Sequence, residues 1–249
     1  MVFDLTTIER ATETIVNYLH IDKTDLLNYL DQHNFDFDIY TFLKDFHIDH
    51  HDLDVTGHSL IAFHLTSSNN SCDDFKKNGI MGAKDAINTE NTLSEYLKEQ
   101  EILFNKEHTY FTYADTIYNI EQYNLYERLV ENHVHCFLSV DDTGYFSEQL
   151  QVRPDIITLI SEIVGEDNIK DFWDANHETY MIKYCDVLEA FDYESICQTN
   201  SIHDAILQLL LYAVDMILFN GHVEISAWMK KNHVIKPSNI IYIRQYYNN

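Results

Sequence analysis

The run Ser59-Leu60-Ile61-Ala62-Phe63-His64-Leu65 is a short apolar segment with turn-forming residues on both sides. Gly57 precedes it, and a serine pair and an asparagine pair follow it within five residues. Short apolar runs bounded in this way are typical of buried strands. Residues 59–65 are therefore predicted to form a strand, at the point where the chain changes from a helical to a mixed pattern.

The chain before this strand has a helical pattern. Its apolar residues recur with the spacing of one helix face, at Ile8, Ala11, Ile15, Tyr18 and Leu19. A second short helix is expected to follow Thr24, and apolar residues at 42–46 continue the pattern. These observations predict a helical N-terminal lobe over residues 1–56 and a second domain over residues 57–249.

The chain after the strand alternates between helical and strand-like patterns, without a regular βαβ order. Helices are expected at residues 71–77, 92–100, 118–131, 154–164 and 202–219. Further strands are expected at residues 108–113, 134–140, 179–185, 222–228 and 240–243, and a turn at residues 141–144. This order of elements predicts an α+β fold.

The charge is strongly one-sided, because 41 acidic residues face 16 basic ones and the formal net charge is −25. Phosphate backbones bind through lysine and arginine, so the charge argues against nucleic acid as a partner. The same charge would attract a basic protein surface and speed the encounter with it. Two interpretations stay open: an acidic surface that serves solubility or salt tolerance, and one that meets a basic partner.

The cysteines and the apolar segments indicate the compartment. The four cysteines form no CxxC pair and fit neither a zinc knuckle nor a dense disulfide scaffold. The N-terminus has early acidic residues and lacks the apolar centre of a signal peptide. The longest apolar stretch, residues 206–219, is too short to span a bilayer. We therefore expect a soluble, cytoplasmic protein without membrane contact.

Residues 47–54 contain six side chains that are able to bind metal within eight positions, in the sequence His-Ile-Asp-His-His-Asp-Leu-Asp. Divalent metals accept imidazole and carboxylate ligands. The spacing matches no established zinc motif, and neighbours in an extended segment point in alternating directions. A solvated loop is the favoured interpretation, with a metal site as the alternative, and no metal is predicted.

Three segments carry polar and aromatic residues in a suggestive order. The first is Phe63-His64-Leu65-Thr66-Ser67-Ser68, which is followed by a short helix and by Asn78-Gly79-Ile80. The second contains Tyr110-Phe111-Thr112 and is followed by Tyr118 and Tyr123. The third is Val223-Glu224-Ile225. This order resembles the ADP-ribosyltransferase superfamily of the His-Tyr-Glu kind over residues 58–246, and it also resembles a group of Firmicute and phage proteins with an N-terminal helical lobe.

The resemblance implies a fold, a co-substrate and roles for three residues. It implies two small sheets around a cleft, with NAD as the co-substrate. His64, Tyr110 and Glu224 match the catalytic positions of the family. Glu224 would stabilise the positive charge that develops on the ribose when the nicotinamide bond breaks. His64 would hydrogen-bond a ribose hydroxyl of the adenosine half.

The resemblance also implies residues that bind NAD without taking part in bond breaking. Thr66 would lie beside His64 against the adenosine ribose. Tyr118, Tyr123 or Tyr110 would stack on the nicotinamide ring through an aromatic face.

Two positions depart from the family pattern. Leu65 follows the histidine where the family commonly has glycine, so the space for the nicotinamide ring is reduced. His222 lies two positions before Glu224, where transferases that modify arginine carry an acidic residue or glutamine. Arginine is therefore the less expected acceptor.

These observations support two function classes. The first is an NAD-dependent ADP-ribosyltransferase that modifies a macromolecule, or hydrolyses NAD, in conflict between a phage and its host. The alternative is a non-catalytic acidic protein that inhibits a basic host or defence protein. A fold can persist after its chemistry is lost, so the two classes are compatible.

Overall fold

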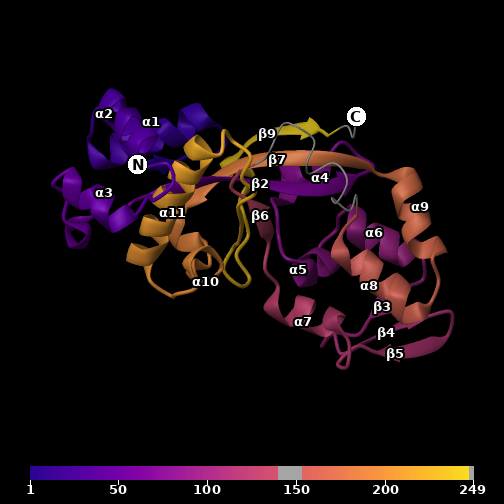
Figure 1. The fold of residues 1–249 in the computed structure, drawn as a ribbon. Helices are drawn as coiled ribbons and strands as arrows, with labels where there is room; N and C mark the ends of the chain where they lie inside the picture. The colour runs from indigo at the N-terminus through magenta and orange to yellow at the C-terminus, as the bar shows by residue number, and fades with distance from the viewer. Residues whose placement is uncertain (140–152, 247–249) are drawn as a thin grey trace. The chain divides into compact units, whose positions relative to one another are not determined.

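The computed structural model describes residues 1–139 and 153–246, which fold into a mixture of helices and strands (Figure 1). The α+β fold class predicted from the sequence is confirmed. The chain divides into two compact units. The described part of unit 1 comprises residues 1–63, 135–139 and 185–228, and that of unit 2 comprises residues 64–134, 153–184 and 229–246.

Unit 1 contains the N-terminal helices and the longest helix of the described chain. Its elements are β1 (Val2–Phe3), α1 (Ile8–Leu19), α2 (Lys23–Gln32), α3 (Ile39–Asp45), the 3₁₀ turn η1 (His50–Asp52), the start of β2 (Ser59–Ser68), β6 (His135–Phe137), the end of β7 (Glu178–Val187), η3 (Leu188–Ala190), α10 (Tyr193–Cys197), α11 (Ile202–Leu218) and β8 (Ser226–Trp228). The side chain of Thr7 caps α1 by accepting a hydrogen bond from the Arg10 amide. Helix α1 packs against α11, which places its apolar face in the core (Figure 1).

The N-terminus is tied to β2 rather than folding apart. Strand β1 runs parallel to β2, with Val2 opposite Ser59. Phe3 is fully buried and meets the ring of His58 edge-on, with 5.6 Å between the ring centroids. The predicted helices of the N-terminal lobe are present, but the division into units does not fall at the predicted boundary between residues 56 and 57. The N-terminal segment shares unit 1 with later parts of the chain because β1 and α1 pack against them.

Unit 2 is built around a three-stranded antiparallel sheet and the helices that pack with it. Its elements are the end of β2, α4 (Asp73–Asn78), α5 (Ala83–Asn88), α6 (Thr92–Glu99), β3 (Leu103–Phe104), β4 (Tyr110–Tyr113), β5 (Thr116–Asn119), α7 (Asn124–Glu131), α8 (Asp155–Val164), α9 (Asn168–Asn176), most of β7, η4 (Pro237–Asn239) and β9 (Ile240–Gln245). The strand order of the small sheet is β3-β4-β5. Its core gathers apolar residues from α6, α7, α8 and α9 around Phe111.

The larger sheet has the strand order β8-β6-β2-β7-β9, with β1 beside β2. The pairs β2–β6, β6–β8 and β7–β9 are antiparallel, with Phe63 opposite Phe137, Cys136 opposite Ala227, and Ile182 opposite Ile243. The strands predicted at residues 59–65, 179–185 and 240–243 are therefore confirmed.

Two predicted elements are wrong in part. The helix expected at residues 118–131 begins only at Asn124, because residues 116–119 form β5 and pair with β4. Ala114 and Asp115 both have positive φ, which is the conformation that a two-residue hairpin turn requires. The strand expected at residues 222–228 begins at Ser226. The pattern also missed β1, α5, β3, α9 and α10, and the turn expected at 141–144 lies outside the described residues.

The sequence predicted that the longest apolar stretch is too short to span a bilayer, and the lengths of the helices bear on this expectation. Within residues 1–139 and 153–246, no helix combines the length and the apolar character that crossing a bilayer requires.

Acid should destabilise unit 2 through His177. Its ring stacks on Trp173 with 3.7 Å between centroids, and its Nδ1 lies 2.8 Å from the Trp173 carbonyl oxygen. Its buried Nε2 has no hydrogen-bond partner among the described residues. Burial lowers the pKa of His177, so the unfolded chain takes up the proton more readily than the folded chain. The stabilisation is complete above the ordinary histidine pKa of about 6.5 and is lost as the pH falls below it.

The test is the melting temperature measured by circular dichroism at several values between about pH 7.5 and pH 5.5. We expect His177→Gln to weaken the pH dependence without abolishing it, because burial also lowers the pKa of His108. His33→Gln, at a partly exposed histidine of unit 1, is the matched control for replacing a histidine by glutamine. Identical pH profiles for wild type and His177→Gln would contradict the prediction.

Candidate functional site

His64 and Thr66 lie on β2, in the part of that strand that belongs to unit 2. They are two positions apart, so their side chains leave the same face of the strand. His64 is half-buried, and its ring centroid lies 6.5 Å from that of Phe75 in α4. Ser67 is buried on the other face, where its Oγ accepts a hydrogen bond of 2.8 Å from Trp173 Nε1. This bond joins the end of β2 to α9.

The turn after α4 requires glycine. Gly79 ends the helix with a φ of 81°, a left-handed conformation that favours glycine. A Cβ at this position would also collide with the carbonyl oxygen of Ile235. The close approach allows the Ile80 amide to donate to Ile235 O at 3.0 Å, and the Ile235 amide to donate to Ile80 O at 2.9 Å. The Gly79-Ile80 pair therefore connects α4 to a distant segment of unit 2.

The three tyrosines expected at the nicotinamide ring do not share one environment. Tyr110 is 40% exposed at the start of β4 and pairs with Asn119, whereas Tyr118 pairs with Phe111. Residues directly opposite each other share a face of the sheet, so Tyr110 and Tyr118 lie on opposite faces. The Tyr118 ring stacks on Phe111 with 5.2 Å between centroids and belongs to the packing of the core. Tyr123 is 40% exposed just before α7.

Glu224 lies in the segment between α11 and β8, not on a strand as expected. Its side chain is exposed, while its neighbours are held by Ser139. The Ser139 Oγ donates to the Val223 carbonyl oxygen and accepts from the Ile225 amide at 3.1 Å. Hydrogen bonds to a serine hydroxyl thus replace strand-to-strand backbone hydrogen bonds at Val223 and Ile225, the residues on either side of Glu224.

The predicted NAD-site residues are divided between the two units. Glu224 belongs to unit 1, whereas the other predicted site residues belong to unit 2. Within unit 2, His64 lies on the larger sheet and Tyr110 on the three-stranded sheet. The structure therefore gives each residue a local setting, and their assembly into one NAD site stays a prediction.

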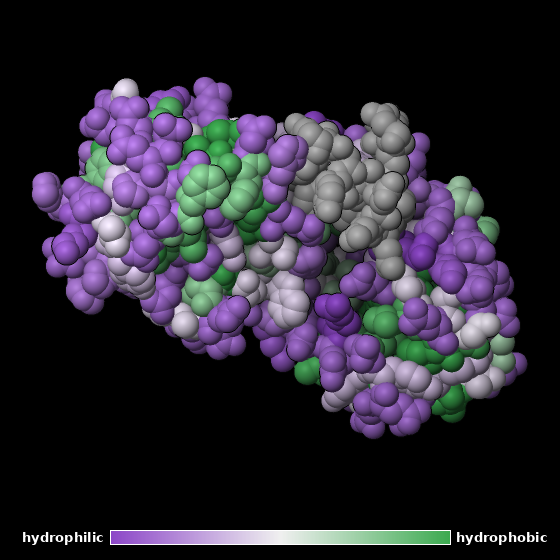
Figure 2. Space-filling view, in the orientation of Figure 1, coloured by the Kyte–Doolittle hydropathy of each residue, from purple (hydrophilic) through white to green (hydrophobic). Residues whose placement is uncertain are grey.

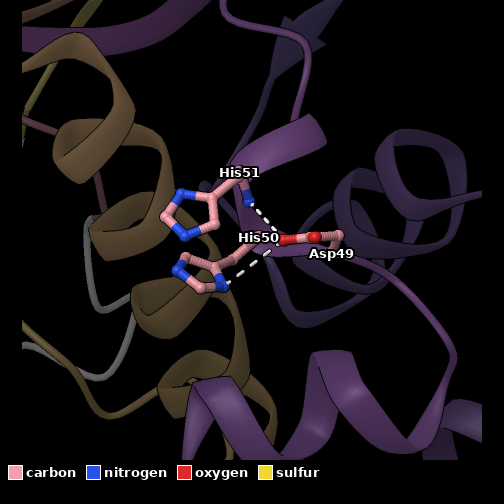
Figure 3. A group of neighbouring side chains, drawn as sticks. All are labelled: Asp49, His50 and His51. Carbon is pink, nitrogen blue, oxygen red and sulfur yellow. Dashed lines mark hydrogen bonds and ion pairs between the residues drawn. The ribbon is translucent and has the colours of Figure 1, made fainter.

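The His/Asp segment does bring three possible metal ligands together. The ligand atoms of Asp49, His50 and His51 all lie within 4.8 Å of one another (Figure 3). Asp49 and His51 are exposed, and His50 is half-buried. The loop expected from the sequence is a 3₁₀ turn, η1, with Asp49 as its capping residue.

A second group of side chains stands out on the hairpin of α2 and α3. Residues 20–54 contain nine aspartates and two lysines, and all nine aspartates are exposed. Hydrophilic residues dominate the surface over α1, α2 and α3, as Figure 2 shows at its upper left. In the described part of the chain, no lysine or arginine forms an ion pair with any of these nine carboxylates.

Several side chains of this group are linked by contacts. Tyr29 and His33 are one helical turn apart on α2 and stack with 4.3 Å between ring centroids. The Tyr29 hydroxyl donates to Asp45 Oδ2 at 3.2 Å, and His33 Nδ1 lies 3.6 Å from Asp36 Oδ1. Burial raises the pKa of Tyr29 most, and the hydrogen bond that Tyr29 donates to Asp45 and the negative charge of Asp45 raise it further. Next to this chain of contacts, the side chain of Phe35 is 98% exposed.

We call the side chains of Asp25, Phe35, Asp36 and Asp45 the acidic hairpin surface. Sequence reasoning registered the charge of the whole chain but not this surface. The available signal was the excess of aspartate over lysine in residues 20–54. The exposure of Phe35 had no signal, because Phe35 and Phe37 occupy similar sequence contexts.

Comparison with known proteins gives no further guide to the site. No family model matches the chain, and no curated protein or solved structure shows a significant match to it.

Proposed function

We propose that this chain is an acidic binding protein whose acidic hairpin surface docks on a basic surface of a partner protein. The observation that carries the proposal is the side chain of Phe35, which is 98% exposed among carboxylates that no lysine or arginine of the described residues neutralises. An exposed aromatic side chain within a charged rim is the arrangement of an interface anchor.

The hairpin folds without using Phe35. The Phe37 ring packs on Phe42 with 5.5 Å between centroids, and Tyr29 packs on Phe42 with 5.2 Å. Phe42 is fully buried. Because these rings already fill the space between α2 and α3, Phe35 is free to enter a pocket of a partner. Single exposed apolar residues are common, so the argument depends on the carboxylates around it.

Folding accounts for some of the nine aspartates but not for all of them. Asp22, Asp38, Asp49 and Asp54 each accept a hydrogen bond from a backbone amide two or three residues on, which caps a helix or a turn. Asp45 is the last residue of α3, where the helix dipole disfavours a negative charge. Asp36 lies in the loop, and the only ionic partner that the described structure gives it is His33. Capping therefore explains neither Asp36 nor Asp45, and both add negative potential to the hairpin.

The partner that fits this surface is a basic protein. Nucleic acid carries the wrong charge. A rim of carboxylates steers a basic surface toward the anchor and raises the association rate, and this effect weakens as salt shortens the Debye length from about 10 Å to less. Binding should therefore be fastest at low salt, while Phe35 sets the rate of dissociation.

Neutralising the surface should weaken its affinity for the partner while leaving the fold intact. The variant is Asp25→Asn/Asp36→Asn/Asp45→Asn. We expect the dissociation constant for the partner to rise by about tenfold or more, because three rim charges each contribute up to about 1 kcal/mol. Stability should change little, since the loss of Asp25 from the first turn of α2 opposes the removal of Asp45 from the end of α3.

The experiment captures proteins from cells that produce this chain, purifies each captured protein, and measures its binding by calorimetry at low and moderate salt. Glu121→Gln/Glu127→Gln/Glu131→Gln changes the charge by the same amount at exposed residues of unit 2 and is the matched control. The proposal predicts a basic partner that binds wild type and the control equally. Equal weakening by both triple variants would point to net charge alone and would contradict the proposal.

A second candidate function is the ADP-ribosyltransferase chemistry that the sequence resemblance implies. It is supported by the order β2, α4 and Gly79-Ile80 in unit 2, with His64 and Thr66 on one face of β2. NAD would be the co-substrate, and Glu224 would supply the carboxylate.

A further inference from the structure

We propose that Asp49, His50 and His51 bind one divalent transition metal ion of the Zn²⁺ class. Their ligand atoms lie within 4.8 Å of one another (Figure 3). Two imidazoles and one carboxylate suit Zn²⁺, Ni²⁺ or Cu²⁺ better than Mg²⁺ or Ca²⁺, which prefer oxygen ligands. The site is distinct from the acidic hairpin surface and from the predicted NAD residues.

The carboxylate of Asp49 is held in place by the backbone. Its Oδ1 accepts a hydrogen bond of 2.9 Å from the His51 amide, and the same oxygen lies 3.7 Å from His50 Nδ1 (Figure 3). The cap therefore fixes one ligand relative to the two residues that supply the others. The second carboxylate oxygen takes no part in this cap hydrogen bond, so it is available to a metal ion.

The two imidazole rings lie close together. Their centroids are 3.9 Å apart, with 38° between the ring planes. Two imidazolium cations at this distance would repel each other, whereas two neutral rings that share a metal ion are held together. The ring of Tyr40 meets His50 edge-on at 5.3 Å and shields that side from solvent.

A fourth residue from a distant part of unit 1 supports the turn. His203 in α11 has its Nε2 2.5 Å from the carbonyl oxygen of His50. A carbonyl only accepts, so Nε2 carries the proton and donates it. The ring of His203 lies 6.2 Å from that of His50 and 6.5 Å from that of His51, measured between centroids. The hydrogen bond fixes residue 50 against α11, and a bound ion would strengthen this link within unit 1.

The experiment titrates metal-free protein with Zn²⁺ by calorimetry and repeats the titration with Co²⁺, whose visible absorption reports its ligands. The ligand variants are His50→Ala and His51→Ala. His47→Asn is the matched control, because His47 is exposed in the same segment but lies outside the cluster. Asparagine is chosen there because residue 47 has a positive φ, which asparagine tolerates.

We expect wild type and His47→Asn to share a Zn²⁺ site that each ligand variant weakens by more than the roughly 10–100-fold that loss of a hydrogen bond to a metal ligand costs. Zn²⁺ should also raise the melting temperature of wild type and not that of the ligand variants, and Mg²⁺ should not compete. Equal Zn²⁺ affinity in wild type and His50→Ala/His51→Ala, or no Zn²⁺ binding by wild type, would overturn the proposal.

Discussion

Replacing Trp173 with alanine should lower the free energy of unfolding of unit 2 by about 3–5 kcal/mol, the range measured for large aromatic residues removed from cores. Trp173 is 1% exposed. Its ring meets Tyr96 edge-on at 4.9 Å and stacks on His177 at 3.7 Å. Its indole Nε1 donates to Ser67 Oγ at 2.8 Å. Alanine would leave a large cavity and an unsatisfied buried hydroxyl at the end of β2.

Two further variants separate the packing of Trp173 from its hydrogen bond. Trp173→Phe keeps most of the ring and removes the bond to Ser67, so it should cost about 1–3 kcal/mol, the penalty for an unsatisfied buried group. Phe172→Ala changes the neighbouring aromatic residue, which is 49% exposed, and should cost clearly less than Trp173→Ala. Denaturant unfolding followed by far-ultraviolet circular dichroism measures all three. Similar losses for Phe172→Ala and Trp173→Ala would refute the central place of Trp173 in the core.

The sequence predicted the elements whose pattern is long or sharply bounded. Helix α11 has 17 residues with a continuous apolar face, and it was expected within one residue of its observed ends. Helix α8 was expected from the Pro154 at its start and the Gly165 at its end, and both positions hold. The strand at residues 59–65 was expected from its apolar run, and it extends three residues further as β2. In each case, the residues that bound the element and the pattern of apolar residues within it indicate the same element.

The errors arose where contacts with distant residues decide the structure. Strand β5 forms because it pairs with β4 across a turn of Ala114 and Asp115, residues that give no hairpin signal. Strand β8 starts late because Ser139, more than eighty residues earlier, occupies the hydrogen-bonding groups around Glu224. Strand β3 has two residues and gives no pattern of its own.

The candidate sites were less predictable than the fold. The sequence showed the residue types of the His/Asp cluster. However, neighbouring side chains in an extended segment point in alternating directions, which argued against their meeting at one metal ion. The 3₁₀ turn η1 overturns that argument, because its residues do not alternate. The contact between His50 and His203 joins residues 153 positions apart and has no sequence signal.

Glu224→Gln should reduce nicotinamide release from NAD by roughly 10²–10³ if the chain is an ADP-ribosyltransferase. Glutamine keeps the shape of the side chain and removes the charge that would stabilise the developing oxocarbenium ion. NAD affinity should change only a few-fold, because the charge acts mainly on the transition state. Glu224 is exposed, so the fold should be unaffected.

His64→Ala should have the complementary effect and weaken NAD binding, because it removes a hydrogen bond made in the ground state. Glu189→Gln, at another exposed glutamate of unit 1, is the matched control and should leave both quantities unchanged. The measurements are calorimetric titration with NAD and nicotinamide release at matched protein concentration. If wild type neither binds NAD nor releases nicotinamide with candidate acceptors present, the catalytic proposal is wrong. The proposal of binding through the acidic hairpin surface would be unaffected, since it requires neither His64 nor Glu224.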